Sequence, residues 1–271
     1  MARTVFYISD GTGITAETLG HSLLTQFDLG DVQQVRVPFV DTLARAEDVA
    51  RAIRRAHADD GQRPLVFHTV INQSHAKLLE ETEACVVDLF GRLVVPLERD
   101  FGLVRKRRVG RAHAMTNVDS YDDRMEATNY ALRHDDGANT DYSEAELILV
   151  GVSRSGKTPT CLYMALQFGV KAANYPLTVD DLDRGELPEA LRGVGGKVFG
   201  LTIEAARLAH IREARRPGSH YASLAQCRRE ISDAELLYQT FKIPHLNTTH
   251  TSVEEICTKV LHKLHLMRRL Y

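Results

Sequence analysis

Apolar and polar positions follow two alternating periods over the first hundred residues. The segments TVFYIS, VQQVRVPFV and PLVFHTV have the composition of strands, and between them apolar residues recur every three or four positions, as in helices. The helical positions are Leu19, Leu23 and Phe27 in the first stripe and Ala46, Val49, Ile53 and Ala56 in the second. Alternation of this kind predicts a mostly parallel sheet covered by helices.

A second alternation of strand and helix patterns occupies the carboxyl-terminal half. Strands are predicted at AELILVG, KAANYPL, KVFGLTI and PHLNTT, with helices over 157–168, AARLAHIREA and YASLAQCRREISDAELLYQTF. A closing helix is predicted from one apolar face formed by Val253, Ile256, Val260, Leu264 and Met267. The chain therefore reads as two α/β halves.

The pattern breaks between residues 102 and 143, where charged residues and turn formers accumulate in RKRRVGRAH, DSYDDRM and HDDGANTD. Met125 and Leu132 can anchor a helix there, and a structureless loop of this length would be unusual in a compact domain. We therefore predict an amino-terminal α/β domain over 1–101, a connecting segment with a helix over 102–143, and a second domain over 144–271.

Composition adds few constraints. A net charge of -2 and 26% charged residues describe a globular protein without global attraction to nucleic acid or to an anionic membrane. The four cysteines form no CxxC pair, which argues against a zinc site or a redox pair and favours a reducing, cytoplasmic compartment. No apolar run approaches the ~20 residues that span a bilayer. We expect neither a nucleic-acid nor a membrane partner.

The segment GVSRSGKT satisfies the pattern GxxxxGK[ST], with a predicted strand before it and a predicted helix after it. Its backbone N–H groups and the start of the helix would surround an anion, Lys157 would reach the terminal phosphate, and Thr158 would coordinate Mg²⁺. The alternative is a tight turn with a surface lysine. The predicted nucleotide-binding residues are Gly151, Val152, Ser153, Arg154, Ser155, Gly156, Lys157 and Thr158, with Lys157 also catalytic and Thr158 the metal ligand.

This half resembles a small P-loop kinase, so the predicted fold is α/β with a Rossmann-like amino-terminal half, a P-loop kinase-like carboxyl-terminal half and mostly parallel sheets. A switch GTPase is disfavoured because no N-K-x-D motif occurs. No Walker B acid is evident: Thr202 and Glu204 end one strand, and Asp180, Asp181 and Asp183 lie in a loop-like stretch, so metal ligation beyond Thr158 stays unassigned. Six arginines could neutralise phosphoryl charge from a mobile lid or simply form a solvated helix face, namely Arg207, Arg212, Arg215, Arg216, Arg228 and Arg229.

A second polar group is predicted at the carboxyl ends of the first-half strands. Asp10 follows the first strand and precedes Gly11, Thr12 and Gly13, with Thr15 able to cap the helix; His68, Asn72 and His75 follow the third strand. Ligands collect at this edge of open α/β sheets. An equally weighted alternative is that Asp10 and Thr15 only cap a helix and that His68 is a core histidine.

Four long segments resemble the family of phosphoenolpyruvate synthase regulatory proteins, which is related to the pyruvate, phosphate dikinase regulatory proteins. The segments are FYISDGTGITAETLGHSLLTQF, GVSRSGKTPTCLYMALQFGVKAANYPL, FGLTIEAARLAHIRE and NTTHTSVEEI. The sequences of LGHSLLTQF, MALQFGVKAANYPL and the RRLY tail resemble the synthase branch more than the dikinase branch. The resemblance covers nearly the whole chain.

The resemblance implies a bifunctional enzyme that acts on phosphoenolpyruvate synthase. Such proteins phosphorylate a threonine of their target with ADP, which inactivates the target, and remove that phosphate with inorganic phosphate, which releases pyrophosphate. The family's nucleotide-binding loop falls on Gly151 to Thr158, and a homodimer is plausible. The basic run Arg105 to Arg111 has no place in the family pattern and is interpreted as a solvated segment or a target-docking surface.

The implied chemistry suits a phosphate loop, because with ADP the β-phosphate is both the group that the loop grips and the group that is transferred. One cradle could serve both directions. The threonine hydroxyl needs a proton acceptor, for which Asp10 is a candidate and Asp180 or Asp181 the rivals. The alternatives are the same chemistry on pyruvate, phosphate dikinase, a small-molecule P-loop kinase whose base site includes NTTHTSVEEI, and a nucleotide-gated binding protein without catalysis.

Overall fold

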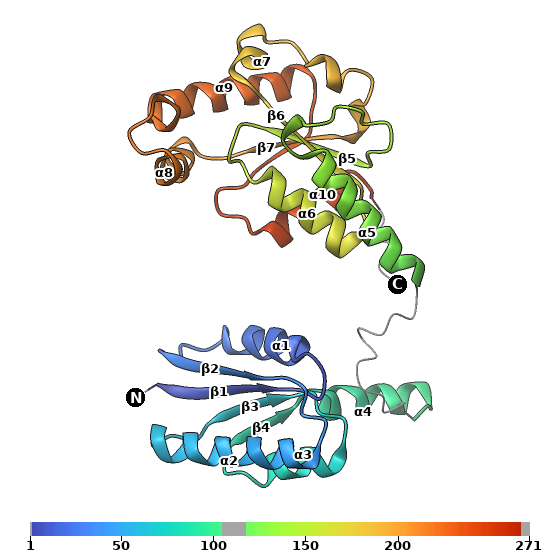
Figure 1. The fold of residues 1–271 in the computed structure, drawn as a ribbon, viewed down its shortest axis with the longest axis vertical. Coiled ribbons are helices and arrows are strands. Elements are labelled where there is room, and N and C mark those ends of the chain that lie inside the picture. The colour runs from blue at the N-terminus through green and yellow to red at the C-terminus, as the bar shows by residue number, and fades with distance from the viewer. Residues whose placement is uncertain (1, 105–117, 267–271) are drawn as a thin grey trace. The chain divides into compact units, whose positions relative to one another are not determined.

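The computed structural model describes residues 2–104 and 118–266, and the chain divides into two compact units, residues 1–114 and 115–271 (Figure 1). Each unit holds one four-stranded sheet in which all strand pairs are parallel. The predicted α/β class with parallel sheets is confirmed. The basic run Arg105 to Arg111, Met267 and the RRLY ending lie outside the described residues.

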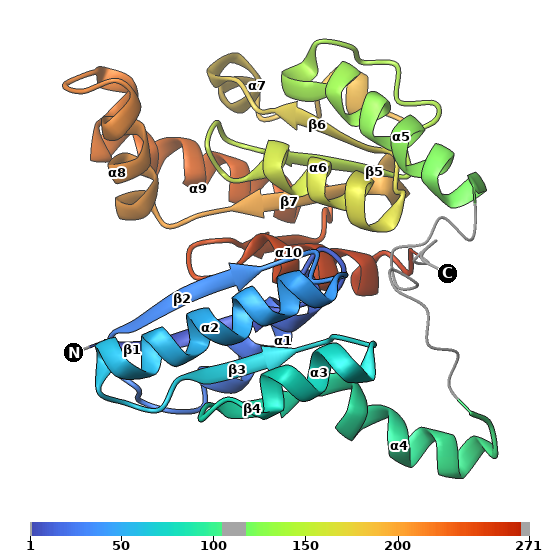
Figure 2. The ribbon, with the colours of Figure 1, turned by 60° about the horizontal axis from the view of Figure 1, so that its bottom comes forward.

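The first unit is a parallel sheet with strand order β2-β1-β3-β4 and helices on both faces. Phe6 and Ile8 of the central strand β1 pack with α2 and α3, whereas Val5 and Tyr7 pack towards α1 and α4 (Figure 2). The elements are β1 (Arg3–Ile8), α1 (Ile14–Leu24), β2 (Val32–Val37), α2 (Leu43–Asp60), β3 (Leu65–His68), α3 (Gln73–Glu80), β4 (Cys85–Asp88) and α4 (Leu89–Phe101).

The second unit repeats this strand order as β6-β5-β7-β8. Its α-helices and strands are α5 (Val118–Arg133), β5 (Leu147–Gly151), α6 (Lys157–Phe168), β6 (Ala172–Pro176), α7 (Val179–Arg184), β7 (Val198–Thr202), α8 (Ala205–Arg215), α9 (Leu224–Thr240), β8 (His245–Asn247) and α10 (Val253–Lys263). Short 3₁₀ turns are η1 (Asp135–Gly137), η2 (Glu189–Leu191), η3 (Gly195–Lys197) and η4 (His220–Ala222).

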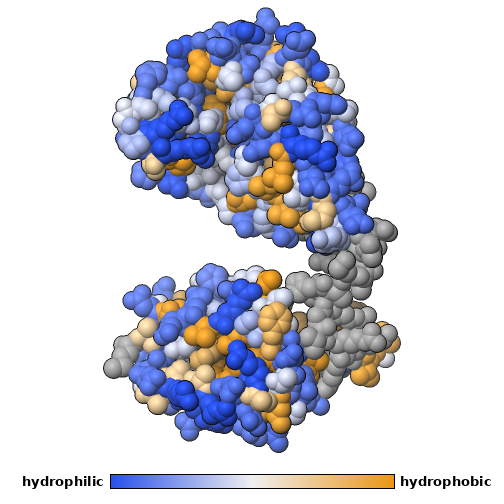
Figure 3. Space-filling view, viewed as in Figure 1, coloured by the Kyte–Doolittle hydropathy of each residue, from blue (hydrophilic) through white to orange (hydrophobic). Residues whose placement is uncertain are grey.

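Strand β5 is buried on both faces, which its uninterrupted aliphatic sequence LILVG predicts for a central parallel strand. Ile148 and Val150 join the core formed with α7, α8 and α9. Leu147 and Leu149 join the core formed with α5, α6 and α10. In the space-filling view, hydrophilic residues cover much of the visible face of the second unit, and hydrophobic residues appear in patches on both units (Figure 3).

The first strand of each unit, β1 or β5, stands between its two earliest partners, so the chain leaves the sheet on opposite sides of this strand. In open α/β sheets this switch point, at the carboxyl ends of the strands, is where ligands bind. The loops Asp10–Gly13 and Gly151–Thr158 directly follow β1 and β5. Both segments singled out in the sequence therefore lie at the switch points.

Two predicted helices form but bury other residues than the pattern indicates. In α1, Leu19 and Leu23 are exposed, while Ala16 and Gly20 are buried. Gly20 is required by close packing, because a Cβ there would lie 2.6 Å from Cε1 of Tyr7. Small residues, rather than the large aliphatic ones, let the helix approach the sheet.

The helix predicted for the connecting segment is α5, which packs against α6 within the second unit. The predicted anchors Met125 and Leu132 are 36% and 58% exposed. The face that contacts the core instead carries Ala127 and Ala131. As in α1, small side chains allow the close helix contact, so hydrophobicity alone selected the wrong face.

Candidate functional site

The loop Gly151–Thr158 joins the buried strand β5 to helix α6, which begins at Lys157. Gly151 has no room for a side chain, since a Cβ would lie 2.6 Å from the carbonyl oxygen of Leu201 and 2.7 Å from Oγ of Ser155. Gly156 is the N-cap of α6 with φ of 95°, and no side chain caps the helix. The amide groups of the first turn are therefore left for another acceptor, as in anion-binding loops.

Arg154 lies in the middle of the loop with φ of 76°, in the left-handed region. A residue with a Cβ is destabilised there by roughly 1–2 kcal/mol. Such conformations persist only where the surroundings enforce them, and they cluster at functional sites. The loop is thus held in a conformation that its own sequence does not favour.

Lys157 is a buried cation, with 4% of its surface exposed. Its Nζ donates to the carbonyl oxygens of Gly151 at 3.0 Å and Val152 at 3.1 Å, and among the described residues it forms no ion pair. Burial lowers the pKa of Lys157 from 10.5 to about 8, and the negative charges of Asp136 and Asp135 partly oppose this fall. A buried ammonium group paired only with carbonyl dipoles is suited to receive an anion.

Thr158 is hydrogen-bonded to an acidic residue from before β5. Its hydroxyl donates to Oδ1 of Asp135 at 2.8 Å. The side-chain amide of Asn174, on β6, donates to the same oxygen and lies 3.3 Å from the Thr158 hydroxyl. Asn174 in turn accepts a hydrogen bond from the backbone of Asp136 at 3.1 Å. Strand β6 thereby fixes the turn Asp135–Gly137 beside the loop.

Asp135 and Asn174 were not identified as site residues from the sequence. Asp135 belongs to HDDGANTD, which was interpreted only as a concentration of charge and turn formers. Asn174 is a polar residue, 1% exposed, in the otherwise apolar strand β6. A buried polar side chain requires a hydrogen-bonding partner; this was the one available signal, and it does not name the partner.

Two groups of side chains hold the backbone on either side of Arg154. Arg212, fully buried in α8, donates to the carbonyl oxygen of Ser153 at 3.1 Å and forms an ion pair with Glu230 at 2.6 Å. The Ser153 hydroxyl also lies 2.8 Å from the hydroxyl of Tyr221, whose ring is stacked under the Arg212 guanidinium at 4.1 Å.

On the other side of Arg154, the Thr248 hydroxyl donates to the carbonyl oxygen of Ser155 at 3.1 Å. Thr248 follows β8, whereas Arg212 and Tyr221 lie in α8 and in the η4 turn. These contacts from two distant segments explain how the loop keeps its unfavourable φ.

The arginines predicted for a mobile lid do not behave as one group. Arg212 is buried in the core of the unit and binds the loop through a carbonyl oxygen. Arg229 is exposed and paired with Asp183 at 2.6 Å. The four others, Arg207, Arg215, Arg216 and Arg228, are exposed. Arg212 therefore belongs neither to a mobile lid nor to a solvated helix face, because it is buried and its charge is neutralised by Glu230 inside the unit.

Thr202, Asp180 and Asp181, which were considered for metal or proton chemistry, have other hydrogen-bond partners or lie elsewhere. Thr202, at the end of β7 where a Walker B acid would stand, donates to Glu235 at 2.6 Å. Asp181 forms the capping box of α7 with Thr178 and accepts from the Tyr175 hydroxyl. Asp180 is exposed on the same helix. Among the described residues, the Thr158 hydroxyl forms its side-chain hydrogen bonds with Asp135 and Asn174 and with none of these three.

Asp10 lies at the switch point of the first unit, buried to 7% exposure. Its Oδ2 accepts from the backbone amide of Ile71 at 2.7 Å. Burial raises the pKa of the Asp10 carboxyl, and the hydrogen bond from Ile71 and the nearby His68 oppose that rise. The carboxylate therefore bridges the loops after β1 and β3.

The surroundings of His68 and Asn72 bear on whether this edge of the sheet is a ligand site or has only structural roles. Asn72 caps α3 through the amides of Ser74 and His75, a structural role. Thr15 does not cap α1, whose N-cap is Gly13, and no side-chain cap is present. His68 is fully buried, and neither ring nitrogen has a hydrogen-bond partner among the described residues. Burial lowers its pKa, which favours the neutral imidazole.

No helix within the described ranges combines the length and apolar character needed to cross a bilayer. The four cysteines, all described, are free thiols.

A sequence model of the family described as kinase/pyrophosphorylase matches residues 5–261. A relative from Marinobacter nauticus is 51% identical over 262 residues, covering 96% of this chain and 97% of the relative. A relative from Stenotrophomonas maltophilia is 50% identical over 99% of this chain and 98% of its own. One from Legionella pneumophila is 49% identical over 100% of both chains. All three carry the provisional name phosphoenolpyruvate synthase regulatory protein.

Proposed function

This chain belongs to the kinase/pyrophosphorylase family, and from that premise we propose that it regulates phosphoenolpyruvate synthase by adding and removing one phosphate on a threonine. The names of the relatives support this target. The observation that carries the proposal is the buried cation of Lys157 next to the hydrogen-bonded pair Thr158–Asp135. Together they would supply an anion site in the loop and a proton acceptor beside it, from the turn Asp135–Gly137.

In the forward direction the acceptor threonine attacks the β-phosphorus of ADP. A bond forms between the threonine oxygen and phosphorus, the bond to the bridging oxygen breaks, and AMP leaves with that oxygen. Lys157, the loop amides and the start of α6 would balance the charge on the transferred group. Oδ2 of Asp135 has no hydrogen bond among the described residues and is the oxygen that would accept the threonine proton.

The residues around Thr158 also fit a magnesium ion. Mg²⁺ is usually held by hydroxyl or carboxylate oxygens from one or two side chains together with phosphate oxygens and water. The Thr158 hydroxyl and Asp135 Oδ1 are two such oxygens, 2.8 Å apart. A bound Mg²⁺ would neutralise charge on the diphosphate, while Thr158 and Asp135 orient it.

The reverse direction would use the same cradle. Orthophosphate would occupy the loop and attack the phosphothreonine, so that pyrophosphate forms and the threonine oxygen takes up a proton, which Asp135 can return. Asp10 remains an alternative proton acceptor by prediction. The single GxxxxGK[ST] motif supports a shared site for both directions.

Mass spectrometry of purified phosphoenolpyruvate synthase tests the proposal. Incubation with this protein and ADP should add one phosphate to a threonine and release AMP. Later addition of orthophosphate should remove that phosphate and yield pyrophosphate. A synthase that stays unmodified, while a small metabolite or pyruvate, phosphate dikinase is phosphorylated, would reject the synthase as target.

A further inference from the structure

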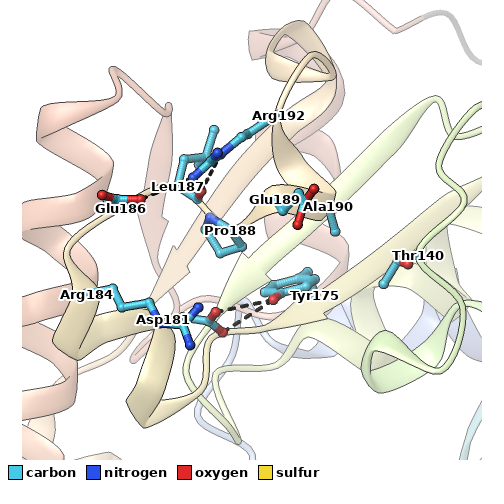
Figure 4. Close-up of a pocket in the computed structure, with 10 residues that line it drawn as sticks. All are labelled: Thr140, Tyr175, Asp181, Arg184, Glu186, Leu187, Pro188, Glu189, Ala190 and Arg192. Atoms are coloured by element: carbon cyan, nitrogen blue, oxygen red, sulfur yellow. Dashed lines mark hydrogen bonds and ion pairs between the residues drawn. The ribbon is translucent and has the colours of Figure 1, made fainter.

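A polar cavity of ≈520 Å³ opens in the second unit between β6 and the segment that follows it (Figure 4). Tyr175 of β6 and Thr140 form one side, and the segment from Asp181 to Arg192 forms the other. The volume lies in the range of ligand sites. No residue of the loop Gly151–Thr158 lines it, so this cavity is separate from the proposed phosphate site.

Backbone segments nevertheless connect the walls of this cavity to that site. Tyr175 is the β6 partner of Val150, one residue before the loop, and neighbouring strands lie about 4.8 Å apart. The backbone amide of Leu177 donates to the carbonyl oxygen of Gly151 at 3.0 Å. Thr140 follows Asp135 by five residues, and Asn174, which holds Asp135, directly precedes Tyr175. The two segments that position the proposed base therefore also contribute to the cavity.

The charges in the cavity are only partly neutralised. Arg192 is paired with Glu186 at 3.2 Å, and Asp181 accepts from Tyr175 and Thr178. Arg184 and Glu189 line the cavity but form no ion pair or side-chain hydrogen bond among the described residues. Arg184 lies close enough to Tyr175 to counteract the rise in its pKa that burial causes. One cation and one carboxylate thus remain available for a ligand.

We propose that this cavity binds the polypeptide segment that flanks the acceptor threonine, with an acidic group of that segment against Arg184 and a basic group against Glu189. The inference rests on the proposed function, because the acceptor hydroxyl has to reach Asp135 and its chain has to pass beside it. Five of the ten lining residues are charged, whereas sites for small molecules are mostly apolar. A charged, open cavity is suited to bind a polar segment of another protein.

Initial rates of ADP-dependent phosphorylation, measured against the concentration of purified phosphoenolpyruvate synthase, test this assignment. Arg184→Glu and Glu189→Lys should each raise KM for the synthase by about fivefold or more, with little change in kcat. The Kd for ADP, measured by calorimetry, should stay unchanged. Lys259→Glu, which reverses an exposed charge on α10 away from the cavity, is the matched control.

Direct binding of the synthase without ADP, measured by interferometry, distinguishes failure of the proposed function from failure of the cavity assignment. If the wild-type protein binds the synthase but transfers no phosphate, the proposed function fails, and weaker binding by Arg184→Glu still supports the cavity. Unchanged KM and unchanged binding in both variants overturn the assignment. A loss of ADP affinity in either variant also overturns it, because the cavity would then hold the nucleotide.

Discussion

The hydroxyl of Thr158 donates a 2.8 Å hydrogen bond to Asp135, which precedes it by 23 residues. Asn174 donates to the same carboxylate oxygen from β6. The edge strand β6 therefore positions a carboxylate beside the Thr158 hydroxyl, in the first turn of α6. Thr202 occupies the end of β7, where a Walker B acid would be expected, and donates to Glu235. The carboxylate beside Thr158 belongs to Asp135, in a turn that contacts β6.

Replacing Asp135 by Asn keeps the size of the side chain but removes its basicity. We expect kcat for threonine phosphorylation to fall by about 10²–10⁴-fold. The Kd for ADP measured without Mg²⁺ should change little, because Lys157 and the loop amides remain. Asp136→Asn is the matched control. If Asp10→Asn lowers kcat to this extent and Asp135→Asn does not, the proton acceptor is Asp10.

The lowered pKa of Lys157 predicts how anion binding depends on pH. Above about pH 8 the ligand-free protein carries a neutral Lys157, and below it a charged one. ADP favours the charged form, so binding at pH 8.5 should be accompanied by proton uptake and should weaken as the pH rises further. Calorimetry in buffers of different ionisation enthalpy measures this uptake. A binding enthalpy independent of the buffer, equal to that of Lys157→Met, would contradict the assignment.

The same pKa shift links Lys157 to stability. Between about pH 8 and 10.5 the unfolded chain retains a proton that the folded protein has released. Stability therefore rises with pH across this window, by roughly 3 kcal/mol in total. Urea unfolding of the wild type and of Lys157→Met should show this rise in the wild type only. Parallel pH profiles would mean that folding does not lower the pKa of Lys157.

The contacts of Arg212 and Tyr221 with Ser153 predict that two substitutions will differ in their effects on stability and on ADP binding. Arg212→Ala leaves the buried carboxylate of Glu230 without its ion-pair partner, although Gln226 still donates to it, and should destabilise the unit by roughly 3–5 kcal/mol. Tyr221→Phe removes only the hydrogen bond to Ser153 and should cost about 1 kcal/mol or less. We expect Tyr221→Phe to weaken ADP binding severalfold while the protein remains folded by circular dichroism. Unchanged affinity would show that Tyr221 does not position the loop.

The left-handed conformation of Arg154 predicts an unusual order of substitutions. Glycine is ordinarily less favourable than alanine, but at φ of 76° glycine avoids the Cβ strain. Arg154→Gly should therefore be more stable than Arg154→Ala by about 1 kcal/mol in urea unfolding. Both variants remove the same charge, so the comparison isolates the backbone. Equal stability would indicate that the loop relaxes freely.

The strand–loop–helix geometry around Gly151–Thr158 and the α/β class could be predicted from the sequence because both depend on short segments. The octet Gly151–Thr158 contains its own glycines, lysine and threonine, and the strand and helix beside it have clear periodicity. The buried faces of the helices were harder to predict from the sequence. Leu19, Met125 and Leu132 have the hydrophobicity of core residues, but the helices approach their neighbours through Ala16, Gly20 and Ala127. The distance at which each helix packs, and not the hydrophobicity of its residues, determined which face is buried.

The sequence by itself determined the parallel α/β units and the strand–loop–helix segment that carries Lys157 and Thr158. The tertiary structure decided which residues join them: Asp135 through the pairing of β6 with β5, and Arg212 through the packing of α8. These residues are distant in the chain and carry no local pattern, since a carboxylate in a turn and an arginine in a helix are usually solvated. Only the folded sheet brings them within hydrogen-bond distance of the loop.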